Sequence, residues 1–174
     1  MKLNKLALAL ALVTAGSLPC LSAHAEPVEA TATLNVTATT EITHQLTAVS
    51  GVYEGAVAAD KVLAKGTITA LNSPLKKVSL AWVRGINPKA DGKGADFAKI
   101  TKEGGADSDM VIVQLKPETT VSQTQSQSDA DKTTYTLSDA MATTFQYNVV
   151  SADANNVLKG GSYKMTVQAD VVQA

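Results

Sequence analysis

Apolar and polar residues alternate along most of this chain, and the alternation is clearest in the stretch EPVEATATLNVTATTEI at residues 26–42. Every second position there carries a small apolar side chain, namely Val28, Ala30, Ala32, Leu34 and Val36. A period of two residues is typical of an extended strand with one apolar face. No turn sequence ties this stretch to a partner strand, so the surface that its apolar face covers is not evident from the stretch itself.

The same period predicts seven further strands, at residues 40–49, 61–71, 77–84, 97–101, 110–115, 143–151 and 162–172. His44 falls on the apolar side of the first, which indicates either a histidine with a hydrogen-bond partner or a wrong register. Gly66 in the second is expected to mark a bulge or bend. The MVIVQL stretch at 110–115 is almost continuously apolar, which predicts a strand covered on both faces.

Turn and loop sequences separate these strands. Asn72-Ser73-Pro74 predicts a turn, residues 85–96 contain three glycines and a proline, and residues 153–161 predict a turn before the last strand. Residues 119–134 are polar and low in complexity, which favours a surface loop or a hairpin tip. Six or seven short strands at this spacing predict an antiparallel β-sandwich of immunoglobulin-like type.

The first 25 residues have the pattern of a secretory signal peptide. Lys2 and Lys5 precede a short apolar run, and Ala23 and Ala25 flank His24 in an expected cleavage site that is cut after Ala25. Cys20 is the only cysteine, and the Ser-Leu-Pro sequence before it does not fit a lipoprotein signal. The expected mature chain has 174 − 25 = 149 residues, enough for one ordinary domain with a core, and it has no disulfide.

The charge is nearly balanced overall but uneven along the chain. The mature chain carries 13 basic and 16 acidic residues, because two of the 15 basic residues lie in the leader, and its net charge is −3. Residues 76–102 hold seven basic and two acidic residues, a local charge of +5. Such a segment attracts anions, but lysines that solvate strands and loops are the better explanation than a dedicated site.

The sequence offers no set of residues for catalysis. The expected mature chain has one histidine, no cysteine and none of the common nucleophile, phosphate-loop or zinc-protease motifs, so we predict no enzyme, cofactor or metal. Aspartates at 107, 109, 129 and 131 lie in polar loop sequence without the spacing of a calcium-binding loop. Nothing in the composition indicates nucleic-acid binding.

The two ends of the mature chain suggest a common use. An immunoglobulin-like sandwich whose final apolar strand runs to the last residue is expected to lack its last edge strand. The missing strand would leave unpaired backbone groups and exposed core. The unpartnered strand at residues 26–38 could fill that gap in a neighbouring copy.

Three segments also resemble the chaperone-usher pilins of the long-loop, disulfide-poor class, which include the Saf, Sef, Dr and aggregative-adherence fimbrial subunits and the plague capsular antigen. The first is the threonine-rich start VEATATLNVTATTEI. The second is GVYEGAVAADKVLAKGTITA with VRGI after the next strand, and the third is the ending GGSYKMTVQADVV. The cysteine pair of the Dr and aggregative-adherence members is absent here, so their binding properties are not carried over.

The resemblance implies an all-β, incomplete immunoglobulin-like sandwich completed by donor-strand exchange. Residues 1–25 would be the signal peptide, 26–38 the donor strand and 39–174 the pilin domain. The donor side chains would be Val28, Ala30, Ala32, Leu34 and Val36, and the acceptor groove would be lined by Ile42, Leu46, Tyr163, Met165, Val167, Ala169 and Val171. The partners would be a periplasmic chaperone, an outer-membrane usher and further copies of the chain in a surface fimbria.

Two alternatives remain open at this point. The chain could be a monomeric exported binding domain or adhesin whose N-terminal stretch pairs with its own sheet. It could also be a fimbrial subunit that binds a host surface glycan or protein through residues 76–102. The sequence does not identify a host receptor, a major or minor subunit role, or the morphology of the product.

Overall fold

The computed structural model describes residues 41–127 and 130–174, all of which lie in the compact unit Thr37–Ala174. The predicted leader and donor strand fall outside the described residues. The described chain is built of β-strands and one short 3₁₀ helix, Asp107–Asp109. It contains no helix long and apolar enough to cross a membrane.

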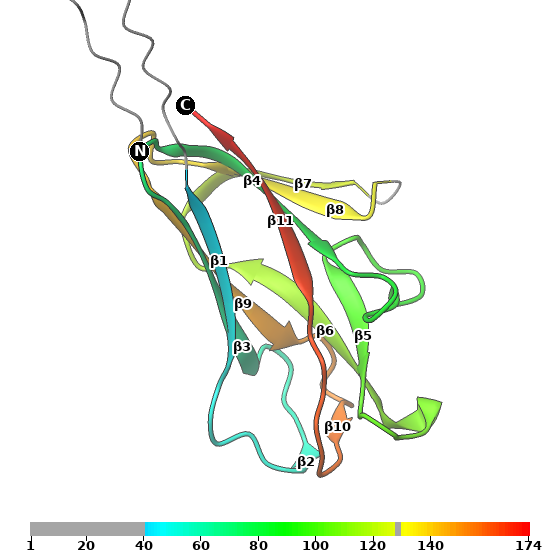
Figure 1. The fold of residues 1–174 in the computed structure, drawn as a ribbon. Coiled ribbons are helices and arrows are strands. Elements are labelled where there is room, and N and C mark those ends of the chain that lie inside the picture. Colours follow the sequence, from blue (N-terminus) through cyan, green and yellow to red (C-terminus); the bar gives the residue numbers. More distant parts are fainter. Residues whose placement is uncertain (1–40, 128–129) are drawn as a thin grey trace, which may run out of the picture. The chain divides into compact units, whose positions relative to one another are not determined.

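Two antiparallel sheets form a sandwich (Figure 1). The five-stranded sheet has the order β1-β3-β9-β6-β5, with β1 at Ile42–Ala48, β3 at Val62–Ala70, β9 at Thr144–Ser151, β6 at Met110–Pro117 and β5 at Phe97–Thr101. The four-stranded sheet has the order β11-β4-β8-β7, with β11 at Val167–Gln173, β4 at Leu75–Trp82, β8 at Lys132–Leu137 and β7 at Val121–Gln127. A small ribbon pairs β2, Gly55–Ala56, with β10, Val157–Leu158.

The core lies between the two large sheets and consists of the alternate apolar residues that the sequence pattern predicts. Val78 and Leu80 of β4 are fully buried, as are Phe145, Tyr147 and Val149 of β9. The fold class predicted from the sequence, an all-β sandwich, is therefore confirmed. The described residues contain more strands than predicted, because β7, β8 and the β2–β10 ribbon form outside the predicted strands.

Two local expectations are wrong. Gly66 is no bulge: it pairs regularly with Leu46 and Tyr147, and the register shift between β3 and β9 falls between Val62 and Ala64. A Cβ at Gly66 would overlap the ring of Tyr147, so glycine is required there to let that ring lie across β3.

The strand predicted at residues 110–115 is covered on one face only. Val111, Val113 and Leu115 are buried, whereas Met110 is exposed and Ile112 is only half-buried on the other face. Of the two alternatives for residues 119–134, a surface loop or a hairpin tip, the structure has a hairpin: these residues form most of the β7–β8 pair, whose outer strand is exposed.

Candidate functional site: the open side of the sandwich

One side of the sandwich lacks a covering strand in the part of the chain that the structure describes. We call it the open side; it is bounded by β1, the edge of the five-stranded sheet, and β11, the edge of the four-stranded sheet (Figure 1). Within the described residues β1 pairs only with β3, and β11 pairs only with β4. Each strand therefore presents an edge of unpaired backbone N–H and C=O groups to this side, to which another strand could pair.

The inward side chains on this side are more exposed to solvent than those at the other edge of the five-stranded sheet. On β5, the opposite edge of the five-stranded sheet, the inward residues Ala98 and Ile100 are 0% and 1% exposed. On β1, by contrast, Ile42 is 36% exposed and Leu46 is only half-buried. The inner face of β1 therefore lacks a cover that β5 has.

The inward residues of β11 show the same deficit. Val167 is almost completely buried, whereas Ala169 and Val171 are half-buried although they pack against the core. Their neighbours on β4, Val78 and Leu80, are fully buried. The exposed apolar area thus follows β11 toward its C-terminal end.

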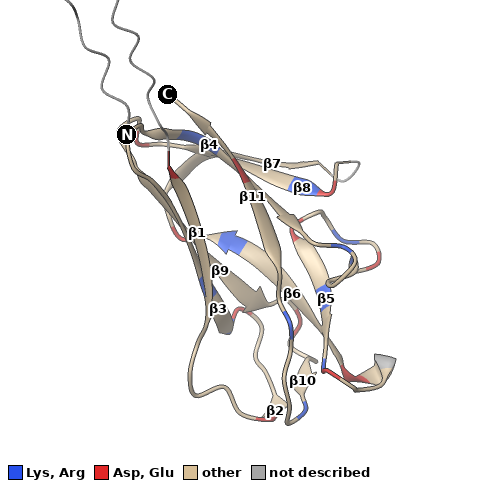
Figure 2. Ribbon diagram, in the orientation of Figure 1, with Lys and Arg blue, Asp and Glu red and all other residues tan. Residues whose placement is uncertain are grey.

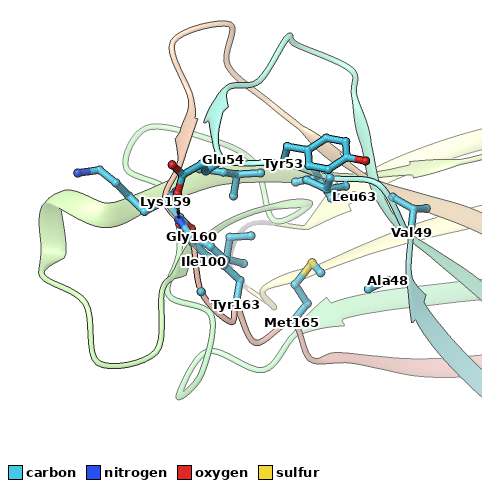
Figure 3. A pocket seen from close by; sticks show the side chains of 13 residues that line it. Ala48, Val49, Tyr53, Glu54, Leu63, Ile100, Lys159, Gly160, Tyr163 and Met165 are labelled. Carbon is cyan, nitrogen blue, oxygen red and sulfur yellow. Dashed lines mark hydrogen bonds between the residues drawn. The ribbon is translucent and has the colours of Figure 1, made fainter.

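A pocket of about 240 Å³ lies at one end of the open side (Figure 3). It is bounded by Ala48 and Val49 at the end of β1 and by Tyr163 and Met165 just before β11. Leu63, Ile100 and Leu158, all buried core residues, also line it. The pocket is therefore an apolar continuation of the open side toward the β2–β10 ribbon.

Hydrogen bonds hold both walls of this pocket in place. The Tyr163 hydroxyl accepts from the Lys159 amide at 2.9 Å and lies 3.2 Å from the Lys159 carbonyl. Glu54 accepts from the Gly160 amide at 3.1 Å. Asn87, which is fully buried, donates to the Lys164 carbonyl at 2.7 Å and accepts from the Thr166 amide at 2.8 Å. These contacts fix the segment that leads into β11 without a ladder of strand pairing.

The predicted acceptor residues are all found at the open side or its pocket, but not all lie in a strand. Val167, Ala169 and Val171 point inward from β11 as predicted. Tyr163 and Met165 precede the strand, which begins five residues later than expected, and Tyr163 forms an isolated bridge with Lys102. Sequence reasoning missed Asn87, whose only signal was an Asn-Pro pair within a loop, and the pocket residues Val52, Leu63 and Leu158.

His44 lies on the inner face of β1, so the register predicted for this strand is correct. Its Nε2 atom shares a hydrogen bond of 2.7 Å with the Tyr147 hydroxyl. Burial lowers the pKa of His44 below its ordinary value of 6.5, and burial raises the pKa of Tyr147. Both groups are therefore neutral at neutral pH, and together they tie the free-edged β1 to the core through the gap that Gly66 leaves.

The basic segment at residues 76–102 does not gather into one patch. Figure 2 shows its charges spread over β4, the loop after β4, and β5. Lys99 pairs with Asp91 at 2.7 Å, and Arg84 and Lys89 both lie within 4 Å of Asp131. Lys93 lies over the ring of Phe97. Three of the seven basic side chains of this segment, Arg84, Lys89 and Lys99, thus lie beside carboxylates of the same domain. The described residues contain no cluster of three or more potential metal ligands.

No family model matches the chain, and no curated protein matches its sequence. Solved structures do match its fold. The SafD adhesin of Salmonella superposes with a TM-score of 0.60 at 14% identity, covering 76% of this chain and 85% of SafD. HdaB, the minor tip subunit of the E. coli Hda pilus, gives 0.58 at 12% identity, covering 76% of this chain and 84% of HdaB.

A structure of the AAF fimbriae of enteroaggregative Escherichia coli, described for fibronectin binding and biofilm formation, gives a TM-score of 0.55 at 17% identity. The match covers 78% of this chain and 87% of that one. At such identities the likeness concerns the fold. The described domain has the β-sandwich fold of the fimbrial subunits that its sequence resembles.

Proposed function

We propose that this protein is a structural subunit of a bacterial surface fimbria, and that its open side accepts the N-terminal segment of a neighbouring copy. The observation that carries the proposal is the incomplete burial of Leu46, Ala169 and Val171 between two unpaired strand edges. An added strand would supply backbone partners to a free edge and cover these side chains together. The similar fold of several fimbrial subunits supports this use of the open side.

The donor segment fits the open side in length and pattern. Residues 28–36 extend over about 26 Å as a strand, which matches β11 together with the two residues before it, from Met165. The five apolar positions of the donor face one way, toward the core side chains that remain half-exposed. Their burial is favourable by about 1.5–3 kcal/mol for each Val or Leu.

The direction of the inserted strand distinguishes a polymer from a self-contained monomer. A donor antiparallel to β11 would run toward the pocket, and its last residues, Leu34 and Val36, would lie there. Residues 37–41 join Val36 to Ile42, and fully extended they span about 20 Å. A donor in its own open side would have to reverse direction at the pocket and return along the length of β1, also about 20 Å, and the residues used in the reversal leave too few for that return. An antiparallel donor must therefore come from another copy.

The monomer alternative requires the opposite direction. A donor that folds back on its own β1 would form a hairpin with it and would run parallel to β11. Since donor and open side lie on the same chain type, the contact between copies is heterologous and grows into a filament.

Deleting residues 26–36 after the leader tests the proposal. The full chain should give heat-sensitive ladders of subunits on unheated denaturing gels, and the deleted chain should remain as chaperone-bound monomer. Ladders from the deleted chain, or a single unheated band from the full chain, would contradict the proposal. Assembly through a periplasmic chaperone and an outer-membrane usher, and display at the cell surface, are parts of the same proposal.

Cysteine pairs test the direction separately, because Cys20 in the expected leader is the only natural cysteine. Val28→Cys with Gln173→Cys should form a disulfide between copies, whereas Val28→Cys with Met165→Cys should not. The reverse result, confined to monomers, would support the self-paired domain.

A further inference from the structure

Large apolar side chains are exposed at both ends of the described domain, away from the open side itself. The upper end, drawn at the top of Figure 1, comprises the start of β1 and the loops β3–β4 and β8–β9. Leu71 is 65% exposed there, and Met141 is 76% exposed. The lower end comprises the β2–β10 ribbon and the loop before it, where Tyr53 is 82% exposed and Val157 is about half exposed.

The two residues of the upper end belong to one surface. The Leu71 amide donates to the Glu41 carbonyl at 3.0 Å, which places the β3–β4 loop beside the start of β1. The Ala70 amide donates to the Thr143 carbonyl, and the Leu75 amide donates to the Ala142 carbonyl. The β8–β9 loop that carries Met141 is therefore tied to both sides of the β3–β4 loop.

The proposed donor path brings the upper end of one copy against the lower end of the next. A donor antiparallel to β11 leaves the neighbour's open side at the pocket, which Tyr53 also lines. The donor continues from Val36 into Ile42 of its own domain through residues 37–41, at most about 20 Å of extended chain. Apolar side chains that project from both ends shorten the distance between the two domains across this connection.

We infer that Leu71 and Met141 of one copy pack against the β2–β10 end of the next, with Tyr53 as the main contact. This contact rests on the proposed function and adds to it a second interface, formed by the domains themselves. The occupant is another copy of this chain, because the short connection places that surface there whenever the donor is inserted. Burial of the four side chains in a joint would hold consecutive domains at a fixed angle and stiffen the fibre.

Disulfide trapping tests the contact. In polymers of the Tyr53→Cys/Met141→Cys double variant, oxidation should link consecutive subunits, so that ladders survive heating without reductant and collapse when reductant is added. Gln125→Cys/Met141→Cys is the matched control, since Gln125 is exposed on β7 and lies at neither end. Heated ladders should be absent in this control and in each single-cysteine variant.

Fibre stiffness gives a second measurement. Leu71→Ser/Met141→Ser polymers should keep their unheated ladders yet bend more sharply in electron micrographs, with a clearly shorter persistence length. Ile86→Ser, which removes an exposed apolar side chain from the β4–β5 loop, should leave the persistence length unchanged.

The outcomes separate this contact from the proposed function. Wild-type ladders, together with no disulfide between positions 53 and 141 of consecutive copies and unchanged stiffness, would overturn the contact and leave donor insertion standing. Absence of ladders from the wild-type chain would overturn both.

Discussion

A single charge placed on alternate faces of the donor segment tests the register of insertion. Leu34→Asp is expected to abolish polymer, whereas Thr33→Asp, on the opposite face, should assemble nearly as the wild type does. Under the proposed direction, residue 34 enters near the pocket end, among apolar side chains such as Leu63 and Met165. Residue 33 would point the same carboxylate into water.

The magnitude follows from what residue 34 would meet. Loss of the buried leucine costs about 1.5–3 kcal/mol, and a polar group without a partner costs about 1–3 kcal/mol more. Lys159, a basic residue on the pocket rim, is already 3.6 Å from Asp109 and gives the new carboxylate little compensation. The total of about 2.5–6 kcal/mol lowers the insertion equilibrium by at least about 70-fold. An exposed substitution such as Thr33→Asp should change it by about 0.5 kcal/mol or less.

The assay is the ratio of unheated ladder to chaperone-bound monomer in periplasmic extracts at matched expression. Ala32→Asp serves as a third variant and should behave as Leu34→Asp does. Equal loss at positions 32, 33 and 34 would refute the alternating face. Equal tolerance at all three would show that this segment is not the joint between subunits.

Three further changes test the domain itself. Gly66→Ala should lower the free energy of unfolding by about 1–3 kcal/mol, because its Cβ would overlap the Tyr147 ring; Gly85→Ala, which meets no atom within 4 Å, is the control in the same denaturant titration. Because the pKa of His44 is lowered in the folded chain, the folded chain binds this proton less readily than the unfolded chain does. The free energy of unfolding should therefore fall as pH drops below about 6.5, and His44→Gln should flatten that part of a plot of unfolding free energy against pH. A short epitope inserted at residues 128–129 should reach antibody on intact cells without loss of ladders, whereas one inserted after Thr124 should interrupt the β7–β8 pairing and lower assembly.

The strands that sequence predicted best are those whose two faces meet different surroundings. In β9, Phe145, Tyr147 and Val149 alternate with polar residues, and the structure buries all three. The last strand has the predicted alternation too, but its start was placed too early. Tyr163 and Met165 continue the apolar period, while their backbone is held by Asn87 and by loop contacts instead of a strand partner.

The errors arise where a distant residue decides the local structure. Gly66 in a strand suggests a bulge from sequence alone, yet here the ring of Tyr147, 81 positions later in the chain, occupies the space above it. The sequence of β7 contains Ser, Gln and Thr without apolar alternation, because this outer strand is exposed on both faces. Backbone pairing with β8, and not burial of its own side chains, holds β7 as a strand.

The sequence could not establish the open side, because an alternating apolar pattern is the same whether the second edge of a strand is paired or unpaired. Ala169 and Val171 have the pattern of ordinary core residues, and only their incomplete burial beside the fully buried Val78 and Leu80 separates them from the core. A sequence pattern thus predicts which way a side chain faces, but it does not predict which chain covers that side chain. The N-terminal segment also has an alternating apolar face, but no turn sequence ties it to a strand that would cover this face. The five residues between Val36 and Ile42 are too few both to reverse the chain at the pocket and to return it along β1. In the proposed polymer the same short connection would hold the next copy close, so chain length would favour the polymer as well as affinity.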